Sequence, residues 1–122
     1  MSKSSTILII EDDQDAAESI EHVCREMGHR TFVAYDGATG LRLAASEKPE
    51  LILSDIAMPG LDGFEVARQI RSNHDLDSTK IVAVTGHPPK TPAKNQKTFD
   101  EYVIKPFSIE QLENVIKKFT GT

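Results

Sequence analysis

Five short apolar runs alternate along the chain with segments in which apolar residues recur at helical spacing. Continuous apolar runs of this length are typical of strands that are buried on both faces of a sheet. The run TFVA is the least apolar, so we expect it at an edge of the sheet. The predicted strands are residues 7–10, 31–34, 51–54, 81–84 and 102–104.

The segments between the runs carry helix stripes and helix stop signals. The first stripe contains Ala16, Ile20, Val23 and Met27 and stops at Gly28, with Asp13 or Asp15 as its cap. The later stripes are Leu41 to Ala45, ended by Pro49; Phe64 to Ile70, ending near residues 72–73; and Ile109 to Phe119. Ser108 and Gln111 have the spacing of a capping box before the last helix.

The connection between the fourth and fifth strands is rich in proline. Residues 87–92 read HPPKTP and cannot form a helix interior, because proline lacks the amide donor. A helix in this connection would be short, with Thr91 as cap and Pro92 as its first residue.

Strands that alternate with helices predict an α/β fold, with a parallel sheet covered by helices on both faces. Five such units are too few for the eight-unit barrel. We therefore predict a doubly wound sheet in the flavodoxin-like order 2-1-3-4-5. The length of 122 residues fits a single domain, 1–122, with a core of about residues 6–119 and no output domain.

Composition and charge narrow the possible functions. The net charge of −5 disfavours sequence-independent nucleic-acid binding, which needs a basic face. Cys24 is the only cysteine and cannot form an internal disulfide, which fits the reducing cytoplasm. The N-terminal apolar run has four residues, too few for a signal peptide, and no stretch approaches a membrane span. We expect a cytoplasmic protein that contacts neither nucleic acid nor membrane.

Polar residues follow four of the five predicted strands where they end. Glu11 and Asp12 follow the first strand, Asp55 the third, Thr85 the fourth and Lys105 the fifth. In a parallel sheet these ends share one edge, where ligands bind. Three converging carboxylates need a cation, and their oxygen ligands suit Mg²⁺ or Mn²⁺. A hydroxyl and a lysine opposite them suit a phosphoryl group, which can join the site by reacting with a carboxylate.

Four motifs, ILIIEDD, LILSDIAMPGLDGFE, VAVTG and YVIKPF, lie in order at strand ends from one end of the chain to the other. Together they resemble the receiver domains of two-component response regulators (the CheY-like superfamily), over essentially all 122 residues. The resemblance implies that Asp55 is the phosphoacceptor. It also implies a Mg²⁺ site made by Asp55, Asp12, Glu11 and the backbone carbonyl of Ala57.

The resemblance further implies how the phosphoryl group is bound and reported. Thr85 and Lys105 would bind it, and the Lys105–Pro106 peptide bond would be cis. Thr85 and Tyr102 would form the switch that responds to it. The expected partners are a histidine kinase or a histidine phosphotransfer protein and an unidentified downstream protein, with the chain a monomer or a phosphorylation-dependent dimer.

The sequence departs from the family pattern at three places. The segment from Thr85 to Lys105 is rich in proline and lacks the usual Ala-Gly before the fifth strand, which argues against a regular helix there. Gly86 replaces the commoner alanine, and Ala57 is smaller than the usual methionine or asparagine. The expected protein is a signalling domain that assists only its own phosphorylation and dephosphorylation, and is otherwise not an enzyme.

Alternative functions remain for this fold. A degenerate receiver would bind partners without phosphate, although Asp55, Thr85 and Lys105 are all present. A flavodoxin-like binder would need a glycine- or hydroxyl-rich loop where this chain has Glu11-Asp12-Asp13. A phosphohydrolase would ordinarily have a second acid at position 57. The four histidines show no metal-binding spacing and are expected at the surface, whereas Cys24 is expected in the core.

Overall fold

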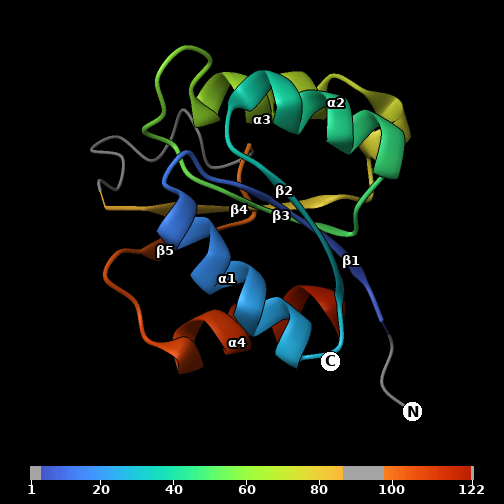
Figure 1. Ribbon diagram of the computed structural model, residues 1–122. Coiled ribbons are helices and arrows are strands. Elements are labelled where there is room, and N and C mark those ends of the chain that lie inside the picture. Colours follow the sequence, from blue (N-terminus) through green and yellow to red (C-terminus); the bar gives the residue numbers. More distant parts are fainter. Residues whose placement is uncertain (1–3, 87–97, 122) are drawn as a thin grey trace.

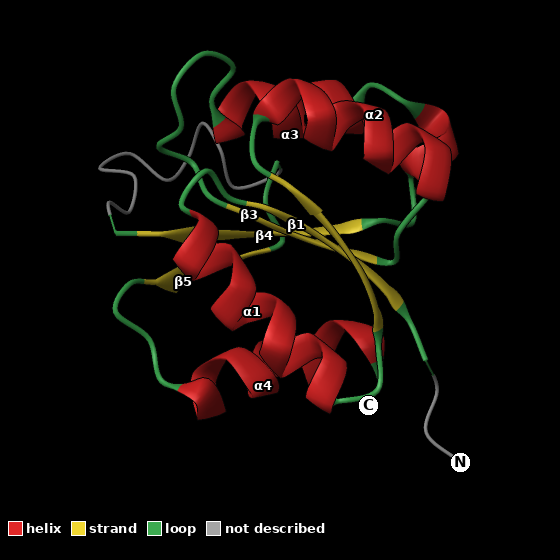
Figure 2. Ribbon diagram, viewed as in Figure 1, coloured by secondary structure: helices red, strands yellow, loops and turns green. Residues whose placement is uncertain are grey.

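The computed structural model describes residues 4–86 and 98–121. Five parallel strands form one sheet in the order β2-β1-β3-β4-β5 (Figures 1 and 2). This order confirms the predicted doubly wound fold and places β2 at an edge. The strands are β1 (Thr6–Ile10), β2 (Arg30–Ala34), β3 (Leu51–Ser54), β4 (Lys80–Thr85) and β5 (Glu101–Ile104).

Helices cover both faces of the sheet (Figure 1). Helices α1 and α4 lie on one face, and α2 and α3 lie on the other (Figure 2). The helices are α1 (Gln14–Glu26), α2 (Gly37–Glu47), α3 (Gly63–Arg71) and α4 (Ile109–Thr120), with a short 3₁₀ helix η1 (His74–Leu76) before β4.

Alternate residues of the inner strands pack into two separate cores. Ile7 and Ile9 of β1 face α1 and α4, whereas Leu8 and Ile10 face α2 and α3. Because successive side chains of a strand point to opposite faces, a strand buried on both faces must be apolar throughout. This is why the apolar runs predicted the inner strands.

Side-chain caps fix where the helices begin. The carboxylate of Asp13 accepts hydrogen bonds from the backbone amides of Asp15 and Ala16, so Asp13 rather than Asp15 caps α1. Asp36 and Asp62 cap α2 and α3 in the same way. Ser108 and Gln111 form the predicted capping box of α4.

Two local features differ from the sequence-based expectations. His29 is buried, and its Nδ1 accepts a hydrogen bond from the backbone amide of Ser5 at 3.0 Å, so the expected surface position is wrong. The 3₁₀ helix η1 was not predicted, and its Leu76 is buried in the core. The helix expected near Thr91 and Pro92, like His87, lies outside the described residues.

Within residues 4–86 and 98–121, none of the helices has the length and apolar character needed to cross a bilayer.

Candidate functional site

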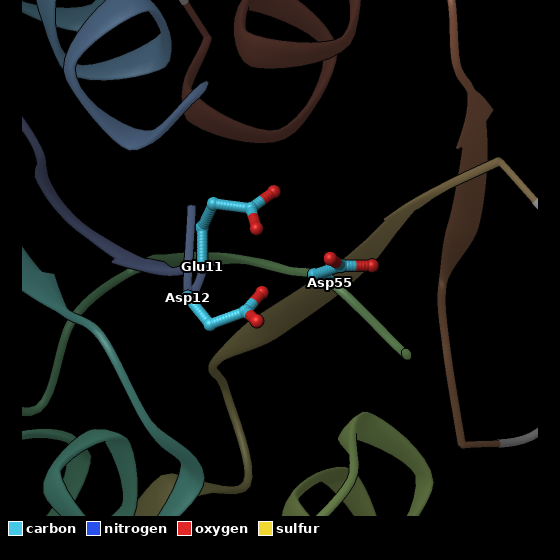
Figure 3. Close-up of side chains that lie close together, drawn as sticks. All are labelled: Glu11, Asp12 and Asp55. Carbon is cyan, nitrogen blue, oxygen red and sulfur yellow. The ribbon is translucent and has the colours of Figure 1, made fainter. Parts of the chain in front are cut away.

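Three carboxylates gather where β1 and β3 end (Figure 3). One oxygen from each of Glu11, Asp12 and Asp55 lies within 4.8 Å of the others. Glu11 and Asp55 are buried, whereas Asp12 is exposed to solvent. The structure therefore brings together the acids that the sequence placed at two separate strand ends.

Backbone pairing holds the carboxylates at this edge. Strands β1 and β3 are neighbours, and the amide of Asp55 donates to the carbonyl of Ile10 at 2.9 Å. The loop after Asp55 folds back, with the Gly63 amide bonded to the Ile56 carbonyl at 2.9 Å. A Cβ at position 63 would lie 2.3 Å from the Asp55 carbonyl oxygen, so the start of α3 packs against the backbone of Asp55 only because residue 63 is glycine.

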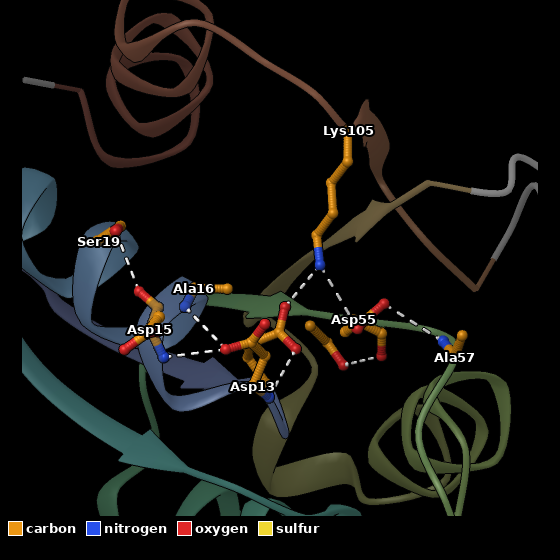
Figure 4. A network of polar contacts seen from close by, with 9 residues as sticks. Asp13, Asp15, Ala16, Ser19, Asp55, Ala57 and Lys105 are labelled. Carbon is orange, nitrogen blue, oxygen red and sulfur yellow. Dashed lines mark hydrogen bonds and ion pairs between the residues drawn. The ribbon is translucent and has the colours of Figure 1, made fainter.

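Lys105 reaches the same site from the end of β5 (Figure 4). Its Nζ lies 2.7 Å from Oε1 of Glu11 and 3.6 Å from Oδ2 of Asp55. Sequence reasoning placed Lys105 at this edge but missed its ion pair with Glu11. Strands β4 and β3 separate β5 from β1 in the sheet, so no local pattern in the sequence indicates this contact.

Burial and charge shift the pKa values of this pair. Burial raises the pKa of Glu11 above its usual range, hydrogen bonds from Lys105 and the Asp13 amide oppose the rise, and the nearby charge of Asp55 adds to it. Burial by itself would lower the pKa of Lys105, but the hydrogen bond to Glu11 and the charges of Glu11 and Asp55 together raise it. Lys105 therefore stays positively charged beside the acids.

The remaining predicted site features are Ala57, Thr85 and the Lys105–Pro106 peptide bond. The amide of Ala57 donates to Oδ1 of Asp55 at 3.3 Å, and Ala57 itself is exposed (Figure 4). Thr85 is buried at the end of β4, and its carbonyl accepts a hydrogen bond from the Lys105 amide at 2.8 Å. The Lys105–Pro106 peptide bond is cis, as the family resemblance implied.

Tyr102 lies on β5 and packs with aromatic residues toward α3. Its ring centroid is 5.4 Å from that of Phe99, which in turn lies 5.7 Å from Phe64 at the start of α3. Burial raises the pKa of the Tyr102 phenol. The buried hydroxyl has no hydrogen-bond partner among the described residues. In the described part of the chain, the contacts of this ring are therefore packing contacts.

A groove of about 950 Å³ opens beside the carboxylates, between α1, α4 and the segment after β5. Ile20 and Leu112 contribute apolar lining, and Asp13 and Glu18 contribute acidic lining. Lys105 belongs both to this groove and to the carboxylate cluster. Asp55 does not line the groove, so Lys105 is the residue through which the groove meets the carboxylate cluster.

The donor atoms of the cluster fit a hard divalent cation. The three side chains offer carboxylate oxygens alone, the ligand type that Mg²⁺ prefers, and the exposed Asp12 leaves room for the water ligands that Mg²⁺ retains. A carboxylate that faces a lysine can also attack an electrophilic phosphorus.

Comparisons with known proteins agree with this chemistry. A family model described as the response regulator receiver domain matches residues 7–117. The response regulator ArlR of Staphylococcus saprophyticus is 37% identical over 106 residues, which make up 87% of this chain and 48% of ArlR. The chain spans about half the length of the curated relatives it matches.

Two solved structures share the fold over nearly the whole chain. The receiver domain of the sensor histidine kinase PA1611 from Pseudomonas aeruginosa, with a magnesium ion in its active site cleft, has a TM-score of 0.87 and 27% identity, covering 98% of this chain and 100% of that one. The response regulator TrrA from Thermotoga maritima, in complex with Mg²⁺ and BeF, has a TM-score of 0.84 and 30% identity. The match covers 93% of this chain and 97% of the TrrA chain.

Proposed function

Since this chain belongs to the response regulator receiver domain family, we propose that it accepts a phosphoryl group on Asp55 from a histidine kinase or a histidine phosphotransfer protein. One observation above all supports this proposal: Lys105 Nζ lies 3.6 Å from Oδ2 of Asp55, at the edge where Glu11 and Asp12 add two further carboxylates. A plain surface aspartate would have neither a fixed cation nor a cation site beside it.

The transfer exchanges one bond to phosphorus for another. An oxygen of the Asp55 carboxylate attacks the phosphorus of a phosphohistidine, so a P–O bond forms while the P–N bond breaks. The electron pair of the broken bond stays on the imidazole nitrogen, which takes up a proton from water. Lys105 donates hydrogen bonds to the phosphoryl oxygens and stabilises their charge, as its contacts with Asp55 and Glu11 already stabilise charge.

Glu11, Asp12, Asp55 and the backbone carbonyl of Ala57 would hold Mg²⁺, and Mn²⁺ suits the same oxygen ligands. When bound, Mg²⁺ supplies positive charge against the carboxylates and the transferring phosphoryl group. The Ala57 amide keeps Oδ1 of Asp55 oriented through its hydrogen bond.

Thr85 and Tyr102 carry the response in this proposal. Thr85 ends β4, and its carbonyl accepts a hydrogen bond from the Lys105 amide at the end of β5. If the new phosphoryl group draws the Thr85 hydroxyl toward it, the movement therefore takes place beside β5. The Tyr102 hydroxyl has no hydrogen-bond partner among the described residues, and the ring packs against Phe99. One local contact would thus bias an element with two arrangements.

The phosphodonor would dock in the groove beside Asp55. Receiver domains of response regulators interact with histidine kinases, and here the groove combines an apolar floor with acidic residues. Ile109 at the start of α4 adds an apolar side chain that is 65% exposed. An amphipathic helix with basic flanks has the complementary shape and charge.

Intact-mass measurement after incubation with acetyl phosphate and Mg²⁺ tests the proposal. We expect the mass of one phosphoryl group, lost in Asp55→Asn and retained in the matched control Asp62→Asn. Asp62 lies on the same loop but caps α3, and asparagine still caps a helix. Equal modification of wild type and Asp55→Asn would contradict the assignment.

A further inference from the structure

Arg71, the last residue of α3, makes three polar contacts far from the carboxylate cluster. Its Nη2 lies 2.6 Å from Oδ2 of Asp100, its Nη1 donates to the Thr79 carbonyl at 2.8 Å, and its Nε donates to the Thr98 carbonyl at 3.2 Å. Arg71 and Asp100 are 26% and 28% exposed. The guanidinium thus joins the end of α3 to the residues that lead into β4 and into β5.

Asp100 extends the pairing between β4 and β5 by one residue. Its amide donates to the Ile81 carbonyl at 2.7 Å, and its carboxylate accepts from the Ile81 amide at 2.8 Å. The next pair along the ladder is Val82 with Glu101. Arg71 and Ile81 share Oδ2 of Asp100, so one charged group holds the first pairing of β5 in place.

Strand β5 is a short edge strand of four residues, and in the described part of the sheet it pairs with β4 alone. The buried side chain of Val103 and the ion pair between Glu101 and Lys118 of α4 also hold it. Arg71 and Asp100 add the contact that precedes its first ladder pair. A shift of one residue would turn every side chain of β5 to the other face of the sheet. Tyr102 and the approach of Lys105 to Asp55 both depend on this register, and Phe99, packed between Phe64 and Tyr102, follows it as well.

We propose that Arg71 and Asp100, here the Arg71–Asp100 clamp, are positioning residues that fix the register of β5 and thereby hold Lys105 beside Asp55. The clamp lies at the start of β5 and Lys105 follows its end, about 16 Å away at the usual rise of a strand. The clamp therefore touches neither the phosphoacceptor nor the metal ligands. The functional part of this inference rests on the proposed role of Lys105.

If the clamp positions Lys105, its loss should weaken the binding of a phosphoryl mimic without weakening the binding of Mg²⁺. Arg71→Gln should weaken the binding of beryllofluoride, a phosphoryl mimic that Lys105 would contact under the proposed function, by about five- to tenfold at saturating Mg²⁺. Mg²⁺ affinity should not fall, because its proposed ligands follow β1 and β3, and a displaced Lys105 would take a competing positive charge away from Glu11 and Asp55. Asp100→Asn should act in the same direction. Arg68→Gln is the matched control, since it removes the same charge from an exposed arginine that pairs with Glu65 of its own helix.

A double-mutant cycle shows whether the clamp acts through Lys105. Lys105→Met should weaken beryllofluoride binding, and Arg71→Gln should add no further loss in that background. Full additivity of the two losses, or a parallel loss of Mg²⁺ affinity in Arg71→Gln, would overturn the positioning role.

Hydrogen exchange separates the clamp from the proposed function. The Lys105 amide bonds to the Thr85 carbonyl at the far end of β5. Its exchange should be about tenfold faster in Arg71→Gln and unchanged in Arg68→Gln. Unchanged exchange in Arg71→Gln and in Asp100→Asn would refute the clamp whatever the protein binds. If exchange is faster in Arg71→Gln but the wild-type protein binds no beryllofluoride, the proposed function is refuted and the clamp is still supported.

Discussion

Lys105 follows β5, but its side chain extends past the ends of β4 and β3. Its ammonium group lies close to both Glu11 and Asp55. It supplies one positive charge against three carboxylates, so the site keeps an excess of negative charge that favours a cation. The sequence could place all four residues at one edge, because each directly follows a strand. It could not reveal the Glu11–Lys105 contact, which depends on how far a long side chain reaches over two intervening strands.

Because the site has an excess of negative charge, we expect Asp12→Ala to stabilise the metal-free protein. Without metal, the variant should be more stable than wild type by about 1 kcal/mol, the Coulomb energy of two charges at this spacing in water. Mg²⁺ should raise the melting temperature of wild type and leave the variant unchanged. Thermal melts with and without Mg²⁺ check this, with Asp13→Asn as control. An Asp12→Ala variant that Mg²⁺ still stabilises would remove Asp12 from the metal site.

The exposed side chain at position 57 predicts the lifetime of the phosphoryl group. Ala57 lies next to Asp55 in solvent and is too small to cover an attacking water's path to the phosphorus. We expect Ala57→Met to lengthen the half-life of phosphorylated protein several-fold, measured by loss of the phosphoryl mass over time. Met58 is buried, so Met58→Leu tests for a general effect of the loop. An unchanged decay rate in Ala57→Met would show that position 57 does not control water access.

At the scale of the elements, apolar runs and caps predicted most of the fold. The runs of β1, β3 and β4 are apolar because both faces are covered, and Asp13 and Ser108 mark helix starts. Three features escaped prediction for physical reasons. Helix η1 has a single buried apolar residue and therefore shows no helical periodicity of apolar residues. His29 is buried where its ring accepts a hydrogen bond from the amide of Ser5, which is distant in sequence. The Arg71–Asp100 clamp joins residues that are 29 positions apart.

The capping box of α4 predicts a measurable loss of stability. Ser108→Ala removes the side-chain acceptor of the Gln111 amide and should destabilise the protein by about 1 kcal/mol. Ser108→Asp keeps an acceptor and should stay close to wild type. Urea unfolding of the three proteins checks this order. Equal loss in both variants would mean that the side-chain acceptor at position 108 is not what stabilises the protein.

At the scale of the whole molecule, the buried thiol of Cys24 makes global stability depend on alkaline pH. Burial, with the nearby charge of Glu21, raises its pKa from 9.0 to about 12. Above pH 9 the unfolded chain loses the thiol proton while the folded chain keeps it, so the folded state loses stability as pH rises toward 12. Cys24→Ala should remove that part of the slope in unfolding measurements between pH 8 and pH 10. An identical slope in the variant would assign the pH dependence to other groups.

The whole molecule brings Asp55 within 3.6 Å of Lys105 and within 4.8 Å of two further carboxylates, at the edge where we propose that phosphoryl transfer takes place. The most direct test is to trap the product after incubation with acetyl phosphate and Mg²⁺. Borohydride reduces an aspartyl phosphate to homoserine, and peptide mapping then locates the changed residue. We predict homoserine at position 55 alone. Homoserine at any other position, or unreduced Asp55 in protein that carries a phosphoryl group, would contradict the account.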